Sequence, residues 1–172
     1  MAVSAPRVNL REITPANRAA VEALAVTAEQ SDYVEGVTES LLEAAETPDA
    51  CPWYRAVYAG DTPVGFVMIS DGITVVNPDY LGPYYLWRLL IDRHQQSRGY
   101  GSAALALVIE YLRARPDARV LVTSVGQGAG SPLGFYLSQG FRQTGEVHQG
   151  ELVLELDLVE DGAGIVAAGA AT

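Results

Sequence analysis

One segment, residues 84–115, restricts the possible folds of this chain more than any other. It begins with the aromatic and aliphatic run YYLWRLLI at Tyr84–Ile91, which is typical of a buried strand. A polar stretch at residues 92–98 follows, and the motif Gly99-Tyr100-Gly101-Ser102 then opens a predicted helix. Apolar residues recur in this helix at the α-helical period, at Leu105, Val108, Ile109 and Leu112. The segment therefore predicts a strand, a polar elbow and a helix with one apolar face.

The start of this helix has the features of a phosphate-binding site. The first four backbone N–H groups of a helix have no partner inside it, and the helix dipole places positive charge there. Gly99 and Gly101 lack the Cβ atoms that would hold an anion away from the backbone. We therefore expect the elbow and helix start to bind a phosphate group through backbone amides.

The remaining sequence predicts further strands and helices in a single domain. Apolar runs and alternating patterns indicate the strands, and the pairs Thr14-Pro15 and Ser131-Pro132 indicate helix starts. Residues 159–172 are rich in glycine and alanine without periodicity, so we expect one domain at residues 1–158 and a tail after it. The expected strands are residues 8–13, 53–59, 64–70, 84–91, 120–124, 141–147 and 151–158, and the expected helices are residues 14–25, 37–45, 99–115 and 132–139.

Charge and residue content narrow the classes of partner. The 21 acidic and 11 basic residues give a formal net charge of −10, which disfavours nucleic acid and anionic membranes and attracts cations. One cysteine excludes an internal disulfide, and two histidines argue against a histidine-rich metal site. No apolar run approaches the roughly 20 residues that span a bilayer, and no signal-peptide pattern is present at the N-terminus. We therefore expect a cytoplasmic enzyme or binding module without a metal.

Two other phosphate-binding motifs fit the sequence less well. Residues 99–104 formally match the dinucleotide fingerprint G-x-G-x-x-G/A. However, seven polar residues separate Ile91 from Gly99, and the next strand ends in Val122-Thr123-Ser124 without the carboxylate that would hold a ribose. A Walker nucleotide site requires Gly-Lys-Ser/Thr, which does not occur in the chain.

The hexapeptide QSRGYG at residues 96–101 instead fits the signature Q/R-x-x-G-x-G/A, and here the chain resembles the GNAT superfamily of acetyl-CoA-dependent N-acetyltransferases. The resemblance includes VGF at residues 64–66 and the block GFYLSQGF at residues 134–141, and it extends from about residue 8 to residue 158. It implies a mixed α/β fold. In that fold a central, mostly antiparallel sheet is splayed between its fourth and fifth strands and has helices on both faces.

The resemblance also implies the co-substrate and the residues that bind it. Acetyl-CoA would place its pyrophosphate on the elbow and helix start, and its pantetheine arm would pair like an extra strand beside the central strand, where a bulge opens a slot. The pyrophosphate residues implied by the resemblance are Gln96, Ser97, Arg98, Gly99, Tyr100, Gly101 and Ser102, and the pantetheine residues are Leu89, Leu90 and Ile91.

Acetyl transfer to an amine needs a group that takes the amine proton and a donor for the departing thiolate. The resemblance places Tyr136 at the family position of that donor. Many family members carry a glutamate base on the central strand, but the matching position here is Tyr85 and the strand has no carboxylate. Either water relays the proton to a carboxylate elsewhere, for which Glu146 and Glu151 are the candidates, or the amine is deprotonated before it docks. We expect Arg88, a charge in an apolar strand, to be paired structurally with a carboxylate.

The acceptor amine is less constrained. The run LWRLLID at residues 86–92 and Gly130-Ser131-Pro132 look most like bacterial diamine and spermidine/spermine acetyltransferases, and the acidic composition agrees with a polyamine. An amino-group antibiotic and a peptide or protein amine stay open as acceptors. A non-catalytic acyl-CoA sensor is the alternative of a different class. A homodimer is possible, because dimers are common in the family.

Overall fold

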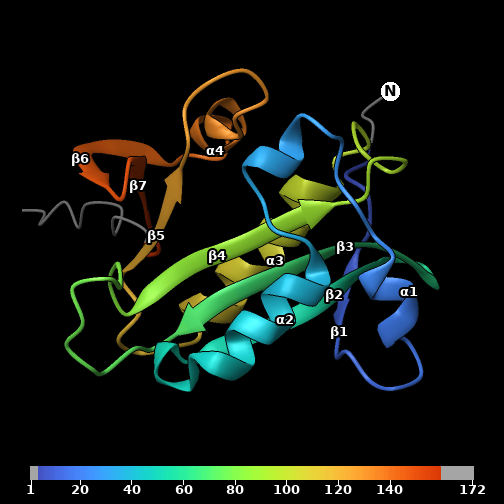
Figure 1. The fold of residues 1–172 in the computed structure, drawn as a ribbon, viewed down its shortest axis with the longest axis horizontal. Coiled ribbons are helices and arrows are strands. Elements are labelled where there is room, and N and C mark those ends of the chain that lie inside the picture. Colours follow the sequence, from blue (N-terminus) through green and yellow to red (C-terminus); the bar gives the residue numbers. More distant parts are fainter. Residues whose placement is uncertain (1–3, 160–172) are drawn as a thin grey trace, which may run out of the picture.

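The computed structural model describes residues 4–159, which form one seven-stranded sheet with helices packed on it (Figure 1). The strand order is β1-β2-β3-β4-β5-β7-β6. The tail predicted at residues 159–172 lies outside the described residues except for Val159. The strands are β1 Asn9–Arg11, β2 Pro52–Ala59, β3 Thr62–Asp71, β4 Tyr84–Ile91, β5 Val120–Val125, β6 Arg142–His148 and β7 Glu151–Asp157. The α-helices are α1 Arg18–Glu22, α2 Val37–Glu46, α3 Tyr100–Arg113 and α4 Leu133–Ser138, and two 3₁₀ turns are η1 Gln30–Asp32 and η2 Pro48–Ala50.

Strands β4 and β5 diverge at the centre of the sheet (Figure 1). They are parallel neighbours, whereas every other neighbouring pair is antiparallel, and they are in register only at Tyr85 and Val122. Two hydrogen bonds also join them: the Thr123 hydroxyl donates to the carbonyl of Leu86 over 3.0 Å, and the hydroxyls of Tyr85 and Ser124 lie 2.7 Å apart. Most of the β5-facing backbone of β4 is therefore left without a strand partner, as the predicted splay requires.

Two apolar cores hold helices on opposite faces of the sheet. Helix α3 packs on one face through its buried side chains, and α1 and α2 pack on the other face. The α3 core includes Val67, Leu86, Leu105, Val108 and Leu121, and the α1/α2 core includes Val21, Val37, Leu41, Phe66 and Leu90. Helices on both faces of a mostly antiparallel sheet were expected, and the structure confirms this architecture.

A β-bulge at Trp87 changes which face of the sheet β4 presents to each core. Two consecutive residues of β3 pair with Leu86 and Arg88, so Trp87 is the extra residue between them. Since side chains alternate along a strand, one extra residue reverses the pattern. Leu86 packs in the α3 core before the bulge, whereas Leu90 packs in the α1/α2 core after it. The bulge therefore turns Trp87 and Arg88 toward the α2 side.

Helix α1 is shorter than the helix predicted at residues 14–25. Thr14 does not cap it, because the Thr14 amide donates to the Asn17 side chain over 2.8 Å and residues 14–17 form a turn. At the other end, Ala25 is tied to the elbow after β4. Its amide donates to the Asp92 carboxylate over 3.0 Å, and its carbonyl accepts from Arg93 over 2.8 Å. These long-range bonds end the helix and hold the following segment against the elbow.

Candidate active site

The elbow between β4 and α3 is fixed in a conformation that exposes backbone amides. Gly99, the residue before α3, has φ +80° and Ser97 has φ +62°, both in the left-handed region that favours glycine. The Gln96 side-chain amide donates to the Ile91 carbonyl over 3.0 Å and to the Gln30 side chain over 2.6 Å. The first turn of α3 then presents N–H groups that have no acceptor within the helix.

A cavity of about 430 Å³ opens over this elbow and the end of β4, and we call it the cofactor cavity. Eight of the ten predicted cofactor residues line it: Leu89, Ile91, Gln96, Ser97, Gly99, Tyr100, Gly101 and Ser102. The other two do not, since Leu90 is 1% exposed and packs in the α1/α2 core and Arg98 is an exposed residue of the elbow. The Leu90 side chain is therefore not available to a ligand in this cavity, and Leu90 can contribute only its backbone.

The far walls of the cofactor cavity come from residues that the sequence did not place at this site. Tyr33 and Val34, before α2, lie on one side, and Ser131 and Phe135, at α4, lie on the other. The Tyr33 hydroxyl donates to the Ala129 carbonyl over 2.8 Å and thereby joins the two walls. Apart from the Ser131-Pro132 helix start, no local pattern marks these residues, because the long-range fold brings them together.

The cofactor cavity fits an anionic, elongated ligand. No aspartate or glutamate is among its lining residues, although the chain as a whole carries a net charge of −10. A Cβ atom added to Gly101 would lie 3.5 Å from the Phe135 ring and 3.7 Å from Ile91, in ordinary van der Waals contact with two residues that line the cavity. Exposed backbone amides, missing Cβ atoms and missing carboxylates all favour a phosphate group over a cation.

A second cavity, of about 340 Å³, follows the first along β4 and has the opposite character. Residues Tyr85 and Trp87 of β4 line it, whereas Leu89 and Ile91 line the cofactor cavity. Its wall includes three carboxylates and three aromatic rings and, among its lining residues, no lysine or arginine. These residues are Glu43, Asp79 and Glu151, and Tyr80, Tyr85 and Trp87. We call this space the acidic cavity, and its chemistry favours a cation.

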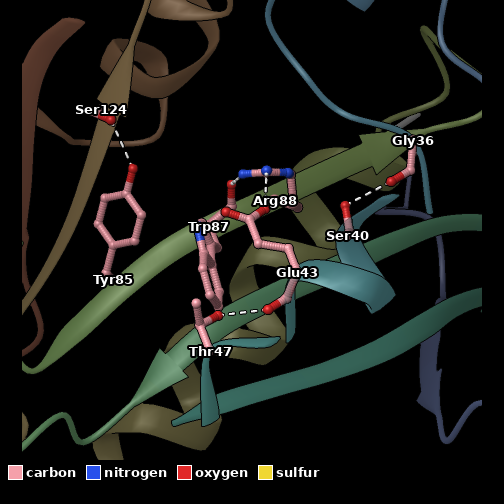
Figure 2. A network of polar contacts seen from close by, with 8 residues as sticks. All are labelled: Gly36, Ser40, Glu43, Thr47, Tyr85, Trp87, Arg88 and Ser124. Atoms are coloured by element: carbon pink, nitrogen blue, oxygen red, sulfur yellow. Dashed lines mark hydrogen bonds and ion pairs between the residues drawn. The ribbon is translucent and has the colours of Figure 1, made fainter. Parts of the chain in front are cut away.

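Arg88 is paired with Glu43, as expected (Figure 2). Its guanidinium donates to the Glu43 carboxylate over 2.7 Å and to the Trp87 carbonyl over 2.9 Å. The Arg88 side chain is only 15% exposed, so the pair compensates a charge that would be costly alone. The pair also holds α2 against the bulge in β4 and orients one carboxylate in the wall of the acidic cavity.

Tyr85, Ser124 and Glu151 form a hydrogen-bonded chain across β4, β5 and β7. Figure 2 shows the Tyr85 ring reaching from β4 toward β5, where its hydroxyl lies 2.7 Å from the Ser124 hydroxyl. The Ser124 hydroxyl donates to the Glu151 carboxylate over 2.5 Å. All three residues line the acidic cavity. Glu146, the other candidate acid, is exposed on β6 and lines neither cavity.

Tyr136 lies on α4 and is 7% exposed. The rings of Phe135 and Phe141 contact it edge-on, with centroids 5.2 and 5.3 Å away. Burial raises the pKa of the Tyr136 phenol, and the phenol of Tyr85 adds to the rise. No residue in the described part of the chain forms a hydrogen bond with the Tyr136 hydroxyl. Tyr136 therefore holds its proton at neutral pH and has a donor that is not already engaged.

Comparison with known proteins identifies the fold. The model of the acetyltransferase (GNAT) family matches residues 10–141, most of the chain. The chain belongs to the GNAT family. Both the family and the fold predicted from the sequence are confirmed, and the chain is an N-acetyltransferase of a family whose co-substrate is acetyl-CoA.

Similar proteins cover almost the whole chain. A probable spermine N(1)-acetyltransferase of Bacillus subtilis subsp. natto (strain BEST195) is 30% identical over 155 residues, which are 88% of this chain and 99% of that protein. The spermine/spermidine N(1)-acetyltransferase of Bacillus subtilis (strain 168) is 29% identical over 155 residues, which are again 88% of this chain and 99% of that protein. Among solved structures, an aminoglycoside acetyltransferase in complex with coenzyme A has a TM-score of 0.70 at 15% identity, covering 88% of this chain and 95% of that one.

None of the helices in residues 4–159 combines the length and the apolar character needed to cross a membrane. Within the same range, no three His, Cys, Asp or Glu side chains come together in a group that could hold a metal ion.

Proposed function

We propose that this GNAT enzyme transfers the acetyl group of acetyl-CoA to a primary amine of a small polycation such as spermine or spermidine. The observation that carries the proposal is the contrast between two neighbouring cavities along β4. The cofactor cavity has no carboxylate in its wall, and the acidic cavity has three carboxylates and no lysine or arginine. Two relatives whose names give spermine or spermidine as the substrate support the same class of acceptor.

In this proposal the elbow and β4 hold acetyl-CoA. The backbone amides of residues 96–102 bind the pyrophosphate, and the free side of β4 at Leu89–Ile91 pairs with the pantetheine arm, because β5 has diverged there. Bound acetyl-CoA supplies a thioester whose carbonyl carbon accepts the amine. A backbone N–H of Leu90 or Ile91 is the candidate donor to the thioester oxygen, where negative charge develops.

Different side chains are proposed for the two proton transfers, one to the departing sulfur and one from the amine. Tyr136, at the family position of the acid, is the proposed hydrogen-bond donor to the departing sulfur; it lines neither cavity itself, but its neighbour Phe135 lines the cofactor cavity and its hydroxyl has no other partner in the described part of the chain. Glu151 receives the proton of the amine, and Glu146 has no role because it lies outside the acidic cavity. Asp79 attracts a distal ammonium group of the polycation, whereas the charge of Glu43 is already paired with Arg88, and the aromatic rings offer their π faces to the cation.

A thiol-release assay with a panel of amines tests the proposal. Acetyl-CoA is supplied with spermine, spermidine, an aminoglycoside or a lysine peptide, and the products are identified by mass spectrometry. We expect the highest kcat/KM with the polyamines and an acetylated polyamine as product. The chain contains no lysine, so acetylation of its own side chains adds no background. Preference for the aminoglycoside or the peptide would refute the polyamine assignment, and no thiol release with any amine would indicate a sensor.

A further inference from the structure

We propose that Tyr85, Ser124 and Glu151 form a proton relay that replaces the missing carboxylate of the central strand. This inference rests on the proposed amine acetylation and goes beyond it by giving the proton a route. Tyr85 occupies the strand position where a base was expected, yet a phenol is a poor base. The hydrogen bonds around it connect that position to a carboxylate two strands away.

The arrangement of strands explains why these three side chains meet. Tyr85 is in register with Val122 of β5, so Ser124, two residues further along, points to the same side of the sheet. Ser124 is paired with Val153 of β7, and Glu151, two residues before Val153, again shares that side. Three neighbouring strands thus each contribute one member, and all three members line the acidic cavity.

The donors in this chain have only one consistent order. Ser124 has a single hydroxyl proton and donates it to Glu151 over 2.5 Å, so its oxygen accepts from Tyr85 over 2.7 Å. The Tyr85 oxygen then keeps a lone pair for an N–H group in the acidic cavity. Burial raises the pKa of Tyr85, the hydrogen bond with Ser124 lowers it by less, and the charge of Glu151 raises it further, so the phenol stays neutral. Tyr85 therefore passes a proton on instead of storing charge.

The proton moves as the C–N bond forms. The reacting nitrogen docks as a neutral amine, becomes positively charged as it attacks, and its N–H group then becomes strongly acidic. That N–H bond breaks as the Tyr85 oxygen takes the proton, the Tyr85 proton passes to Ser124, and the Ser124 proton passes to Glu151. The C–S bond breaks, the thiolate takes a proton from Tyr136, and Glu151 and Tyr136 later exchange protons with water. The net products are an N-acetylamine and free coenzyme A.

Site-directed variants distinguish a relay from a packing role. Ser124→Ala removes the middle of the chain and leaves both ends, and Glu151→Gln removes the final acceptor. We expect each to lower kcat by about 10²-fold at neutral pH while KM for acetyl-CoA stays within about twofold. The double variant should lose no more than the worse single variant, because one broken link already stops transfer. Ser124→Thr, which keeps a hydroxyl, should retain most of the activity, and Glu146→Gln is the matched control.

The pH profile provides a second test. Without the relay, the proton leaves to solvent, so kcat of Glu151→Gln should rise with pH across a range where wild-type kcat is flat. The charged or titratable groups that face Tyr85 or share its cavity are Glu43, Asp79, Tyr80, Arg88, Tyr136, His148 and Glu151. The same profile in Glu146→Gln should match the wild type.

A measurement without turnover tests the hydrogen-bonded chain itself. In the ligand-free protein, the proton between Ser124 and Glu151 should give a downfield NMR resonance that disappears in both Ser124→Ala and Glu151→Gln. Activity in Ser124→Ala near the wild-type level, or losses that multiply in the double variant, would overturn the relay. These ratios are measured with whichever amine the panel identifies, so failure of the polyamine assignment and failure of the relay are separate results.

Discussion

Replacing Tyr136 by phenylalanine should lower turnover and leave stability nearly unchanged. The side chain is nearly buried, and its hydroxyl has no hydrogen-bond partner in residues 4–159 but is open to water at the tip of the ring. Phenylalanine keeps the edge-on contacts with Phe135 and Phe141. We therefore expect Tyr136→Phe to change the free energy of unfolding by less than about 1 kcal/mol.

The catalytic effect should be much larger than the effect on stability. A positioned general acid contributes about 10²-fold or more, which corresponds to a barrier about 2.7 kcal/mol higher when it is lost. Tyr136→Phe should therefore reduce kcat by about 10²-fold and leave the Kd of acetyl-CoA unchanged, since Tyr136 does not line the cofactor cavity. Because burial raises the pKa of the phenol above its usual value, wild-type turnover should show no loss from this group up to about pH 9.

Urea unfolding, calorimetric titration of acetyl-CoA and steady-state kinetics are the three assays. Tyr58→Phe is the matched control, because Tyr58 is also buried but packs in the α1/α2 core, whereas Tyr136 packs in the α3 core. Unchanged kcat in Tyr136→Phe would remove Tyr136 from the mechanism. A fall in stability of more than about 1 kcal/mol would show instead that the hydroxyl has a structural partner.

The remaining predictions concern the glycines of the elbow and the stability of the protein at alkaline pH. Gly101→Ala should fold normally, because its Cβ would lie 3.5 Å from the nearest atoms, but should weaken acetyl-CoA binding at least about tenfold by filling the phosphate site, as calorimetry will measure. Gly99→Ala, by contrast, should lower the free energy of unfolding by about 1–2 kcal/mol, because alanine is strained at the φ of +80° found there. The Tyr84 hydroxyl donates to Asp117 over 2.7 Å, and burial and this bond raise its pKa to about 12. The stabilisation from Tyr84 is complete below about pH 10 and is lost as pH rises toward 12, so urea unfolding should detect a loss of about 2 kcal/mol that Tyr84→Phe does not show.

The local patterns of the sequence predicted the central elements closely. Strand β4 was expected at Tyr84–Ile91 and is found there, because a continuous apolar run bounded by a proline-containing loop and a polar elbow has few alternatives. The start of α3 was expected at Gly99 and is found one residue later, at Tyr100, since the two glycines and the apolar periodicity mark it independently. These elements determine where the cofactor cavity lies.

Features that depend on contacts between distant residues were not predicted. The length of α1 is set by bonds from Ala25 to Asp92 and Arg93, which no helix propensity encodes. Sequence reasoning placed Tyr85 at the position of a missing base and proposed Glu151 as one of two acids, but could not connect them. Ser124 joins the two only because β5 lies between β4 and β7 in the sheet.

A crystal structure of the enzyme with coenzyme A and spermine would test the central claim most directly. The account predicts the pyrophosphate on the amides of residues 96–102 and a primary amine nitrogen within hydrogen-bonding distance of the Tyr85 hydroxyl, between β4 and β5. A distal nitrogen of spermine should lie beside Asp79. Spermine bound outside the acidic cavity, or coenzyme A bound away from the elbow, would contradict the account.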